Sequence, residues 1–354
     1  MLHTVLLAAL LAASPSPKHA PASPKHAPAH ASAKSEHPGA KAIARELAKE
    51  AHATHPELSA QAIGRTLARA RYQQGIIDAI TKPAEAKPWK DYRPLFLGQK
   101  RIDEGIAFYR AERDTLEALG AKYGVPPEVI VAIVGVETFY GRNVGKYKAL
   151  DALATLAFHY PPREAFFRSE LKQLFLLRGP EFPYQLDELV GSYAGAMGMG
   201  QFMPSSIAKY AIDGDGDGRI DLWRSRSDVL ASVANYLAGY GWERGAPIAD
   251  PAVLPDGMDV APLEMQGLEP KSSVGALFAI GITSERERPP ELPASVLGLD
   301  GEAGREHWVT YRNFYVLSRY NRSPLYCMAV HQLAGAIAAG VAAEPKPAAA
   351  PAAP

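Results

Sequence analysis

Apolar positions recur at three- and four-residue spacing over much of the chain, which is the period of amphipathic helices. The pattern is clear in Ala60–Tyr72 and in Ile102–Leu119, where charged residues separate the apolar ones. A further helix is predicted to open at Val125–Glu128, because proline is tolerated in a first turn and an acidic residue there suits the helix dipole. Helical patterns continue in Asp151–Phe158, Arg163–Leu177, Asp228–Tyr240 and Leu325–Val341.

Two stretches depart from this amphipathic pattern. Val129–Val136 is apolar except for its small residues, which predicts a helix buried on all sides. Residues 251–319 are rich in proline and glycine, and the short runs Trp308–Thr310 and Asn313–Leu317 are typical of strands. The predicted architecture is therefore mainly α, with a helical body and a smaller mixed α/β lobe that flank a cleft.

The two ends of the chain differ from the body in composition. Residues 14–39 are rich in Pro, Ala, His and Lys, and SPKHAP occurs twice, at Ser16–Pro21 and Ser23–Pro28. Such a segment buries too little apolar area to offset its ordering entropy, so we expect a linker. Residues 344–354 predict a similar tail. The folded domain is thus expected over residues 40–343.

Residues 1–13 predict a signal peptide. Thr4–Ala13 is an apolar run too short to span a bilayer but suited to a signal-peptide core, although only His3 precedes it and a short hydrophobic tail is the alternative. Cys327 is the single cysteine, so no cysteine near the start could carry a lipid. We therefore expect a periplasmic protein that is not a lipoprotein. Lys plus Arg equals Asp plus Glu at 38 each, which gives no electrostatic reason to expect a nucleic-acid partner.

Glu137 is the first candidate catalytic residue. It ends the apolar helix in IVGVETFYGRNVG, beside an aromatic pair. A carboxyl among apolar and aromatic groups is expected to have a raised pKa, which keeps it protonated for use as a general acid. The alternative is a glutamate at a helix end that points to water.

The segment GSYAGAMGMGQFMPSS, residues 191–206, is the second candidate. Its glycines at 191, 195, 198 and 200 allow sharp turns and the close approach of a ligand. Gln201 offers an amide to sugar hydroxyls, and Phe202 offers a flat apolar face to a sugar ring. The same letters also fit a core loop with N-cap serines at Ser205 or Ser206.

The acidic segment DGDGDGRIDLWR, residues 213–224, matches a calcium loop of the EF-hand type. Asp213, Asp215 and Asp217 occupy its first, third and fifth positions, and Arg219 can offer a carbonyl at the seventh. The twelfth position, normally a bidentate Glu, is Arg224, and Asp228 is the candidate to replace it. We expect a structural calcium ion and no cofactor for catalysis; a bare acidic turn is the alternative.

The last candidate segment is RYNRSPLY, residues 319–326. Tyr320, Asn321 and Tyr326 combine stacking faces with polar tips, a set that suits carbohydrate. A capped turn before the final helix would use the same residues.

Taken together, these segments resemble the family of membrane-bound lytic murein transglycosylase B, glycoside hydrolase family 103. The shared motifs are YGVPPE, GVET, GRNVGK, LDALATLAF, GAMGMGQFMPSS, SVANYL and NFYVLSRYN. The resemblance implies a lysozyme-like helical domain with one catalytic glutamate, which falls on Glu137. It implies calcium ligands at Asp213, Asp215, Asp217, Arg219 and Asp228, and substrate contacts at Arg163, Phe166, Ser192, Gln201, Phe202, Tyr236, Tyr320, Asn321 and Tyr326. Arg163 matches the second of two arginines usual in the family, Pro162 stands in place of the first, and Phe166 stands where a tyrosine is common.

The resemblance also implies a reaction. The chain would cleave the β-1,4 bond between N-acetylmuramic acid and N-acetylglucosamine in peptidoglycan and leave a 1,6-anhydromuramoyl end. Its partners would be glycan strands, with cell-wall synthesis or division proteins as further candidates, and it would act as a monomer. The alternatives are a hydrolytic muramidase with Asp151 or Asp187 as second carboxylate, a non-catalytic peptidoglycan-binding protein, and, least favoured, a calcium sensor.

Overall fold

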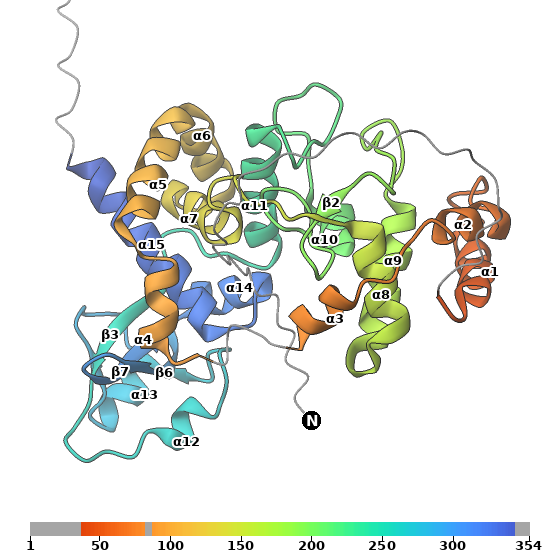
Figure 1. Ribbon diagram of the computed structural model, residues 1–354. Coiled ribbons are helices and arrows are strands. Elements are labelled where there is room, and N and C mark those ends of the chain that lie inside the picture. The colour runs from red at the N-terminus through yellow and green to blue at the C-terminus, as the bar shows by residue number, and fades with distance from the viewer. Residues whose placement is uncertain (1–36, 82–86, 344–354) are drawn as a thin grey trace, which may run out of the picture. The chain divides into compact units, whose positions relative to one another are not determined.

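The computed structural model describes residues 37–81 and 87–343, which form two compact units (Figure 1). The N-terminal unit contains residues 37–81 and 143–209, and the C-terminal unit contains residues 87–142 and 210–343. The predicted signal peptide, the predicted tail and residues 14–36 of the predicted linker lie outside the described residues.

The N-terminal unit is mainly helical. Helix α1 packs against α2, α3 against α8, and α8 against α9, while the two short strands β1 and β2 pair antiparallel. The elements are α1 (Ala40–Ala51), α2 (Ala60–Leu67), α3 (Gln74–Ile80), β1 (Tyr147–Lys148), α8 (Ala149–His159), the 3-10 helix η3 (Pro161–Arg163), α9 (Glu164–Leu176), β2 (Val190–Gly191) and α10 (Pro204–Tyr210), which ends at the boundary.

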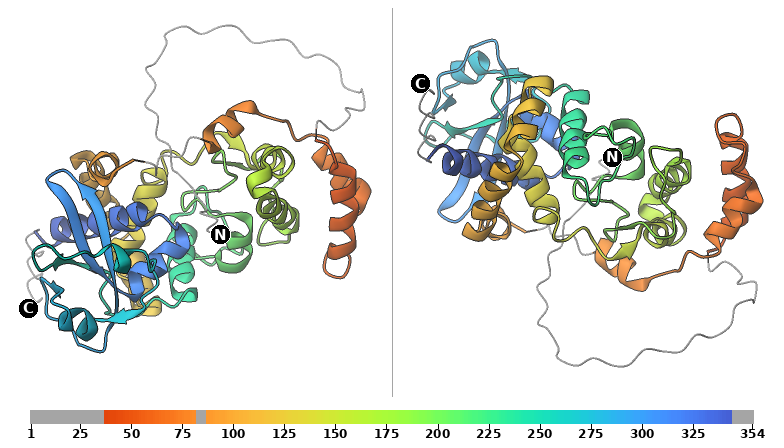
Figure 2. Two further views of the ribbon diagram at one scale, coloured as in Figure 1. Left: turned by 90° about the horizontal axis from the view of Figure 1, so that it is seen from below. Right: turned by 90° about the horizontal axis from the view of Figure 1, so that it is seen from above.

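In the C-terminal unit, α7 lies at the centre and packs against α5, α6, α11 and α15 (Figure 2). The other helices lie in the body or beside a small sheet. The helices are α4 (Trp89–Tyr92), the 3-10 helix η2 (Arg93–Leu95), α5 (Gln99–Ala111), α6 (Arg113–Tyr123), α7 (Pro127–Thr138), α11 (Arg226–Gly239), α12 (Ala261–Glu264), α13 (Val274–Ala279), α14 (Arg312–Tyr320) and α15 (Pro324–Ala342).

The apolar sequence of α7 determines its central place. Pro126 caps the helix and Pro127 fills its first turn, as the sequence predicted. Every residue from Val129 to Thr138 is buried. Each large aliphatic side chain buried in this way contributes roughly 1.5–3 kcal/mol of hydrophobic stabilisation, so the helix is firmly held.

Helix α15 is long and apolar enough to cross a membrane, judged by length and composition alone. In the described chain, however, it packs against α5 and α7, and its residues Tyr326, Leu333 and Ile337 are buried. These contacts are those of a core helix, and the sequence predicted a closing helix here.

The predicted mixed lobe contains a five-stranded antiparallel sheet of order β4-β6-β7-β3-β5. Val260, Leu277, Val296 and Val309 belong to its apolar core. The strands are β3 (Ala249–Val253), β4 (Ser272–Ser273), β5 (Thr283–Ser284), β6 (Pro293–Gly301) and β7 (Gly304–Thr310).

Two predicted elements are corrected by the structure. Ile102–Leu119 is not one helix, because the backbone of Glu112 leaves the helical region and separates α5 from α6. Asn313–Leu317 is not a strand but part of α14. Its burial follows a helical face, with Phe314 and Leu317 buried three residues apart. Asn313 fixes the start of α14, since its side chain bonds the backbone of the 243–246 turn three times.

A buried ion pair predicts acid sensitivity of the sheet. The Asp250 carboxylate accepts two hydrogen bonds from Arg288 and one from the Tyr311 hydroxyl. Burial raises the pKa of Asp250, but these bonds outweigh it and leave the pKa below its ordinary value. A lowered pKa in the folded state means that the stabilisation is present above about pH 4 and is lost as pH falls through the folded pKa.

We therefore expect the wild-type free energy of unfolding to fall below about pH 4, and the fall to be shallower in Asp250→Asn. Urea titrations at pH 3, 4, 5 and 7 measure how steeply the free energy of unfolding changes with pH in the two proteins. Identical slopes in the two proteins would assign the acid sensitivity to other groups.

Candidate active site

Glu137 is the penultimate residue of α7 and is 7% exposed. The chain turns sharply directly after it, because Phe139, Tyr140 and Gly141 have φ of 52°, 59° and 87°. Left-handed backbone is uncommon for residues other than glycine and persists only where the surroundings impose it. A strained turn thus fixes the end of the helix that carries the buried carboxyl.

Several contacts hold this turn. The Tyr140 hydroxyl donates to the Arg101 carbonyl at 2.8 Å, and Thr138 Oγ1 accepts from the Gly141 amide at 3.0 Å. The Arg101 guanidinium lies 4.9 Å from the centre of the Phe139 ring, and burial lowers the pKa of Arg101. A buried arginine stacked on an aromatic ring is a firm support.

Glycines make room for the Tyr140 ring. A Cβ on Gly135 would lie 2.7 Å from ring atoms of Tyr140, and a Cβ on Gly105 would lie 2.4 Å from its hydroxyl oxygen. The ring therefore fits only because α7 and α5 both lack a side chain at these points. The roles of Arg101, Gly105 and Tyr140 were not predicted from the sequence, in which the aromatic pair followed by glycine was the available signal.

Two tyrosines face Glu137 within the C-terminal unit. Burial and the neighbouring Glu137 carboxyl raise the pKa of Tyr320 and of Tyr326 well above the ordinary value. Their rings are stacked, with centres 6.5 Å apart and an interplanar angle of 10°. The Tyr326 hydroxyl is buried and interacts with Glu137, but it has no hydrogen-bond partner of regular geometry among the described residues. Three of the sequence candidates thus meet at one point.

Tyr236 and Asn321 support this group. The Tyr236 ring lies 4.7 Å from that of Tyr320, and its hydroxyl donates to the Arg319 carbonyl. Asn321 Oδ1 accepts from the Ser323 amide, and Ser323 Oγ accepts from the Tyr326 amide. RYNRSPLY is therefore the capped turn before the last helix and also the segment that brings two tyrosines to Glu137.

The glycine-rich segment lies in the N-terminal unit. The atoms that come closest to its glycines belong to the chain itself. A Cβ on Gly191 would lie 2.1 Å from the Ala196 carbonyl oxygen. Ser192 Oγ accepts from the Ala196 amide, and Gln201 Nε2 donates to the Val144 and Gly198 carbonyls. Phe202 is 3% exposed, so little of its ring is open to solvent, and its contact with a sugar ring stays a prediction. The glycines thus serve the chain's own turns.

Arg163 and Phe166 also lie in the N-terminal unit, at the start of α9. The Arg163 guanidinium is 4.2 Å from the centre of the Phe166 ring. The sequence missed nearby Glu170, whose carboxylate accepts from the amide and the hydroxyl of Ser205. Burial raises the pKa of Glu170, which these two bonds and Arg163 partly offset. Its contacts show a carboxyl that holds the start of α10.

The acidic loop brings three carboxylates together. Oxygens of Asp213, Asp215 and Asp217 lie within 4.8 Å of one another. Asp213 accepts from the Gly218 and Gly216 amides, and these bonds lower its pKa. Three converging hard oxygen donors fit a calcium ion.

Asp228 and Arg219 are not part of this trio. Asp228 is 1% exposed, and its carboxylate accepts from the Gly214 and Asp221 amides, which ties the two ends of the loop together. The Arg219 amide donates to Asp217. That Asp228 and the Arg219 carbonyl bind calcium stays a prediction.

The matching family model is described as the transglycosylase SLT domain, and the match extends over residues 40–335. The chain belongs to this family. It is 44% identical over 250 residues to membrane-bound lytic murein transglycosylase B of Escherichia coli, which covers 71% of this chain and 67% of the relative. The family resemblance inferred from the motifs is thus confirmed.

Solved structures confirm the predicted fold class of this transglycosylase SLT domain. The soluble lytic transglycosylase SltB1 of Pseudomonas aeruginosa matches with a TM-score of 0.78 and 42% identity, covering 85% of this chain and 100% of the other. Slt35 of Escherichia coli, solved in complex with calcium, matches with a TM-score of 0.75 and 36% identity, covering 87% and 95%.

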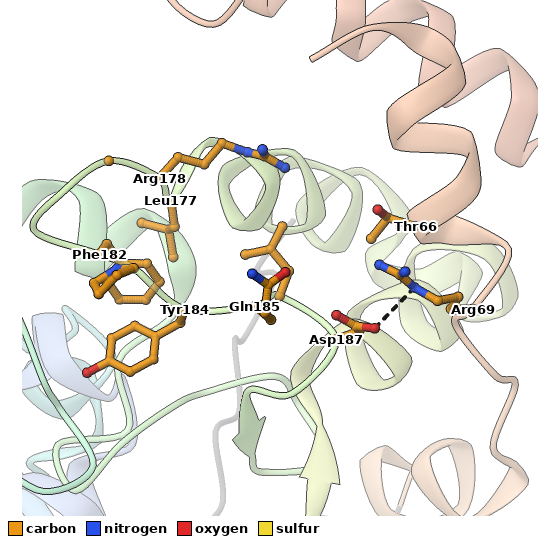
Figure 3. Close-up of a pocket in the computed structure, with 11 residues that line it drawn as sticks. Thr66, Arg69, Leu177, Arg178, Phe182, Tyr184, Gln185 and Asp187 are labelled. Carbon is orange, nitrogen blue, oxygen red and sulfur yellow. Dashed lines mark ion pairs between the residues drawn. The ribbon is translucent and has the colours of Figure 1, made fainter. Parts of the chain in front are cut away.

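Neither aspartate considered as a second carboxylate is free in the N-terminal unit of this SLT domain. Asp151 is buried and accepts from the Arg71 amide and the Gln73 side chain. Asp187 forms an ion pair with Arg69 at 3.1 Å, which Figure 3 shows at one side of a pocket. Both carboxylates thus have structural contacts that hold them in the N-terminal unit.

Proposed function

We propose that the chain is a lytic transglycosylase that cleaves the β-1,4 bond between N-acetylmuramic acid and N-acetylglucosamine of peptidoglycan. The observation that carries the proposal is the buried Glu137 at the strained end of α7, faced by Tyr320 and Tyr326, in a member of the transglycosylase SLT family. Burial of a carboxyl favours its neutral form, which is the form needed to protonate a leaving oxygen.

The proposed reaction uses Glu137 twice. The acid first gives its proton to the glycosidic oxygen as the bond from that oxygen to C1 breaks. The resulting carboxylate then takes the proton of the muramoyl 6-hydroxyl, whose oxygen forms a new bond to C1. Two glycans leave, one with a 1,6-anhydro end; Glu137 is protonated again and no water is consumed. The attached nucleophile has the entropic advantage of an intramolecular reaction.

The substrate's N-acetyl group would stabilise the positive charge at C1, as in substrate-assisted glycosidases. Retaining and inverting hydrolases instead place a second carboxylate across the bond. The contacts of Asp151 and Asp187 argue against that role for either.

Mass spectrometry of digested peptidoglycan tests the proposal. Anhydromuramoyl ends support it, reducing ends indicate a hydrolytic muramidase, and bound but uncut strands indicate a binding protein. We further propose that the chain acts on the cell wall in the periplasm, as a monomer, and cell-wall synthesis or division proteins stay candidate partners.

We also propose that the acidic loop binds a structural calcium ion through Asp213, Asp215 and Asp217. A ligand that binds only the folded state at about 100 times its Kd stabilises by roughly 2.7 kcal/mol, or several degrees of Tm. We therefore expect calcium to raise the Tm of wild type relative to a chelator, magnesium to raise it less, and Asp213→Asn to lose the effect. An equal shift in Asp213→Asn, or none in wild type, would reject the site.

A further inference from the structure

A second charged feature lies in the N-terminal unit, where a cavity of about 850 Å³ is lined by Arg69, Arg71, Lys146 and Lys148 together with Asp151 and Asp187. Four cations and two carboxylates leave the lining positive. Asp187 is paired with Arg69 (Figure 3). Within the described part of the chain, no ion pair is recorded for Arg71, Lys146 or Lys148.

The backbone holds these cations in defined places. Lys148 is the last residue of β1 and Lys146 directly precedes the strand, and both line the cavity. The strand is fixed by its pairing with β2, in which Tyr147 lies opposite Gly191 and Lys148 opposite Val190.

The other wall is fixed by Asp151. Its carboxylate accepts from the Arg71 amide at 3.0 Å and from Gln73 Nε2 at 3.0 Å, and Thr155 Oγ1 accepts from the Gln73 amide. Each oxygen of this carboxylate thus accepts from a neutral donor, and among the described residues the Arg71 guanidinium forms no ion pair with it. A cavity whose wall is held by hydrogen bonds and lined by three cations is suited to binding an anion.

We propose that this cavity binds the free carboxylates of the short peptides that are attached to the muramoyl residues of the glycan. Three cations from two segments of the chain suit a ligand with several carboxylates, and a cavity of about 850 Å³ is large enough for a peptide segment. The inference rests on the proposed function, since it names a second part of the same substrate. The site would add affinity for peptide-bearing strands and leave the chemical step unchanged.

The test measures binding without turnover. Isothermal titration uses a synthetic stem peptide with free carboxylates, the same peptide with every carboxylate amidated, and the full chain. We expect Lys146→Gln/Lys148→Gln to weaken binding of the free-carboxylate peptide about fivefold, because exposed charge contacts are individually weak. The control Lys41→Gln/Lys49→Gln, on α1 of the same unit, should bind as wild type does. Amidation should weaken binding to wild type by a similar factor.

Kinetics separate this proposal from the proposed function. KM for peptide-bearing strands should rise in Lys146→Gln/Lys148→Gln, while KM for strands stripped of their peptides and kcat on both should not change. Equal binding of the two peptides by wild type, or the same KM change on both kinds of strand, would overturn the cavity proposal. If wild type formed no anhydro ends, the proposed function would fail while the peptide titrations could still succeed.

Discussion

Glu137→Gln is expected to lower the formation of anhydromuramoyl ends by about a thousandfold or more. Glutamine keeps the shape of the side chain but can neither give a proton to the glycosidic oxygen nor take one from the 6-hydroxyl. General acid–base catalysis contributes typically 10²–10⁴-fold in rate, and here one residue serves both transfers. Initial rates of anhydro product from purified glycan strands measure the effect.

The matched control for this variant is Glu128→Gln, which makes the same chemical change in the first turn of the same helix. It should keep nearly full activity, and both variants should melt close to wild type. Activity in Glu137→Gln within tenfold of wild type would remove Glu137 from the catalytic role.

Gly145→Ala is expected to cause the largest loss of stability of the glycine substitutions in the N-terminal unit. Gly145 has φ of 99°, and a Cβ there would lie 2.0 Å from the Gly191 carbonyl oxygen. The clash is with backbone at the β1–β2 pair, so a side-chain rotation cannot relieve it. Backbone strain and overpacking together cost on the order of 3 kcal/mol.

Gly179→Ala separates the two causes, because Gly179 has φ of 120° with nothing within 4 Å of an added Cβ. Gly179→Ala should lose stability through backbone strain alone, by about 1 kcal/mol. Urea unfolding midpoints of both variants measure the difference. Equal losses of stability in the two variants would mean that the close approach of Gly145 to Gly191 does not explain why glycine is needed at position 145.

The sequence predicted those parts of the fold in which local pattern and tertiary packing agree. The uniformly apolar Val129–Val136 is the central helix, and the prolines before it are its cap and first turn. Asn313–Leu317 was assigned wrongly, because its aromatic and β-branched residues favour strand while a tertiary anchor at Asn313 and burial of Phe314 and Leu317 favour helix.

The candidate site was predicted in part. Tyr320 follows Glu137 by 183 residues in the sequence, and Tyr326 follows it by 189. Tyr326 meets Glu137 because α15 packs against α7, and Tyr320 ends α14, which packs against α15. Arg101 could not have been found, since nothing in its own segment distinguishes a buried arginine that stacks on Phe139. The grouping of cations around the cavity could likewise not be predicted, because β1 and the segment after α2 are far apart in the chain.

The central claim is that bond cleavage consumes no water. Digestion of glycan strands by wild type in ¹⁸O-labelled water, followed by mass spectrometry of the new muramoyl ends, tests it most directly. The account predicts ends that are one water lighter than reducing ends and carry no ¹⁸O. Reducing muramoyl ends that carry ¹⁸O would contradict it and establish hydrolysis instead.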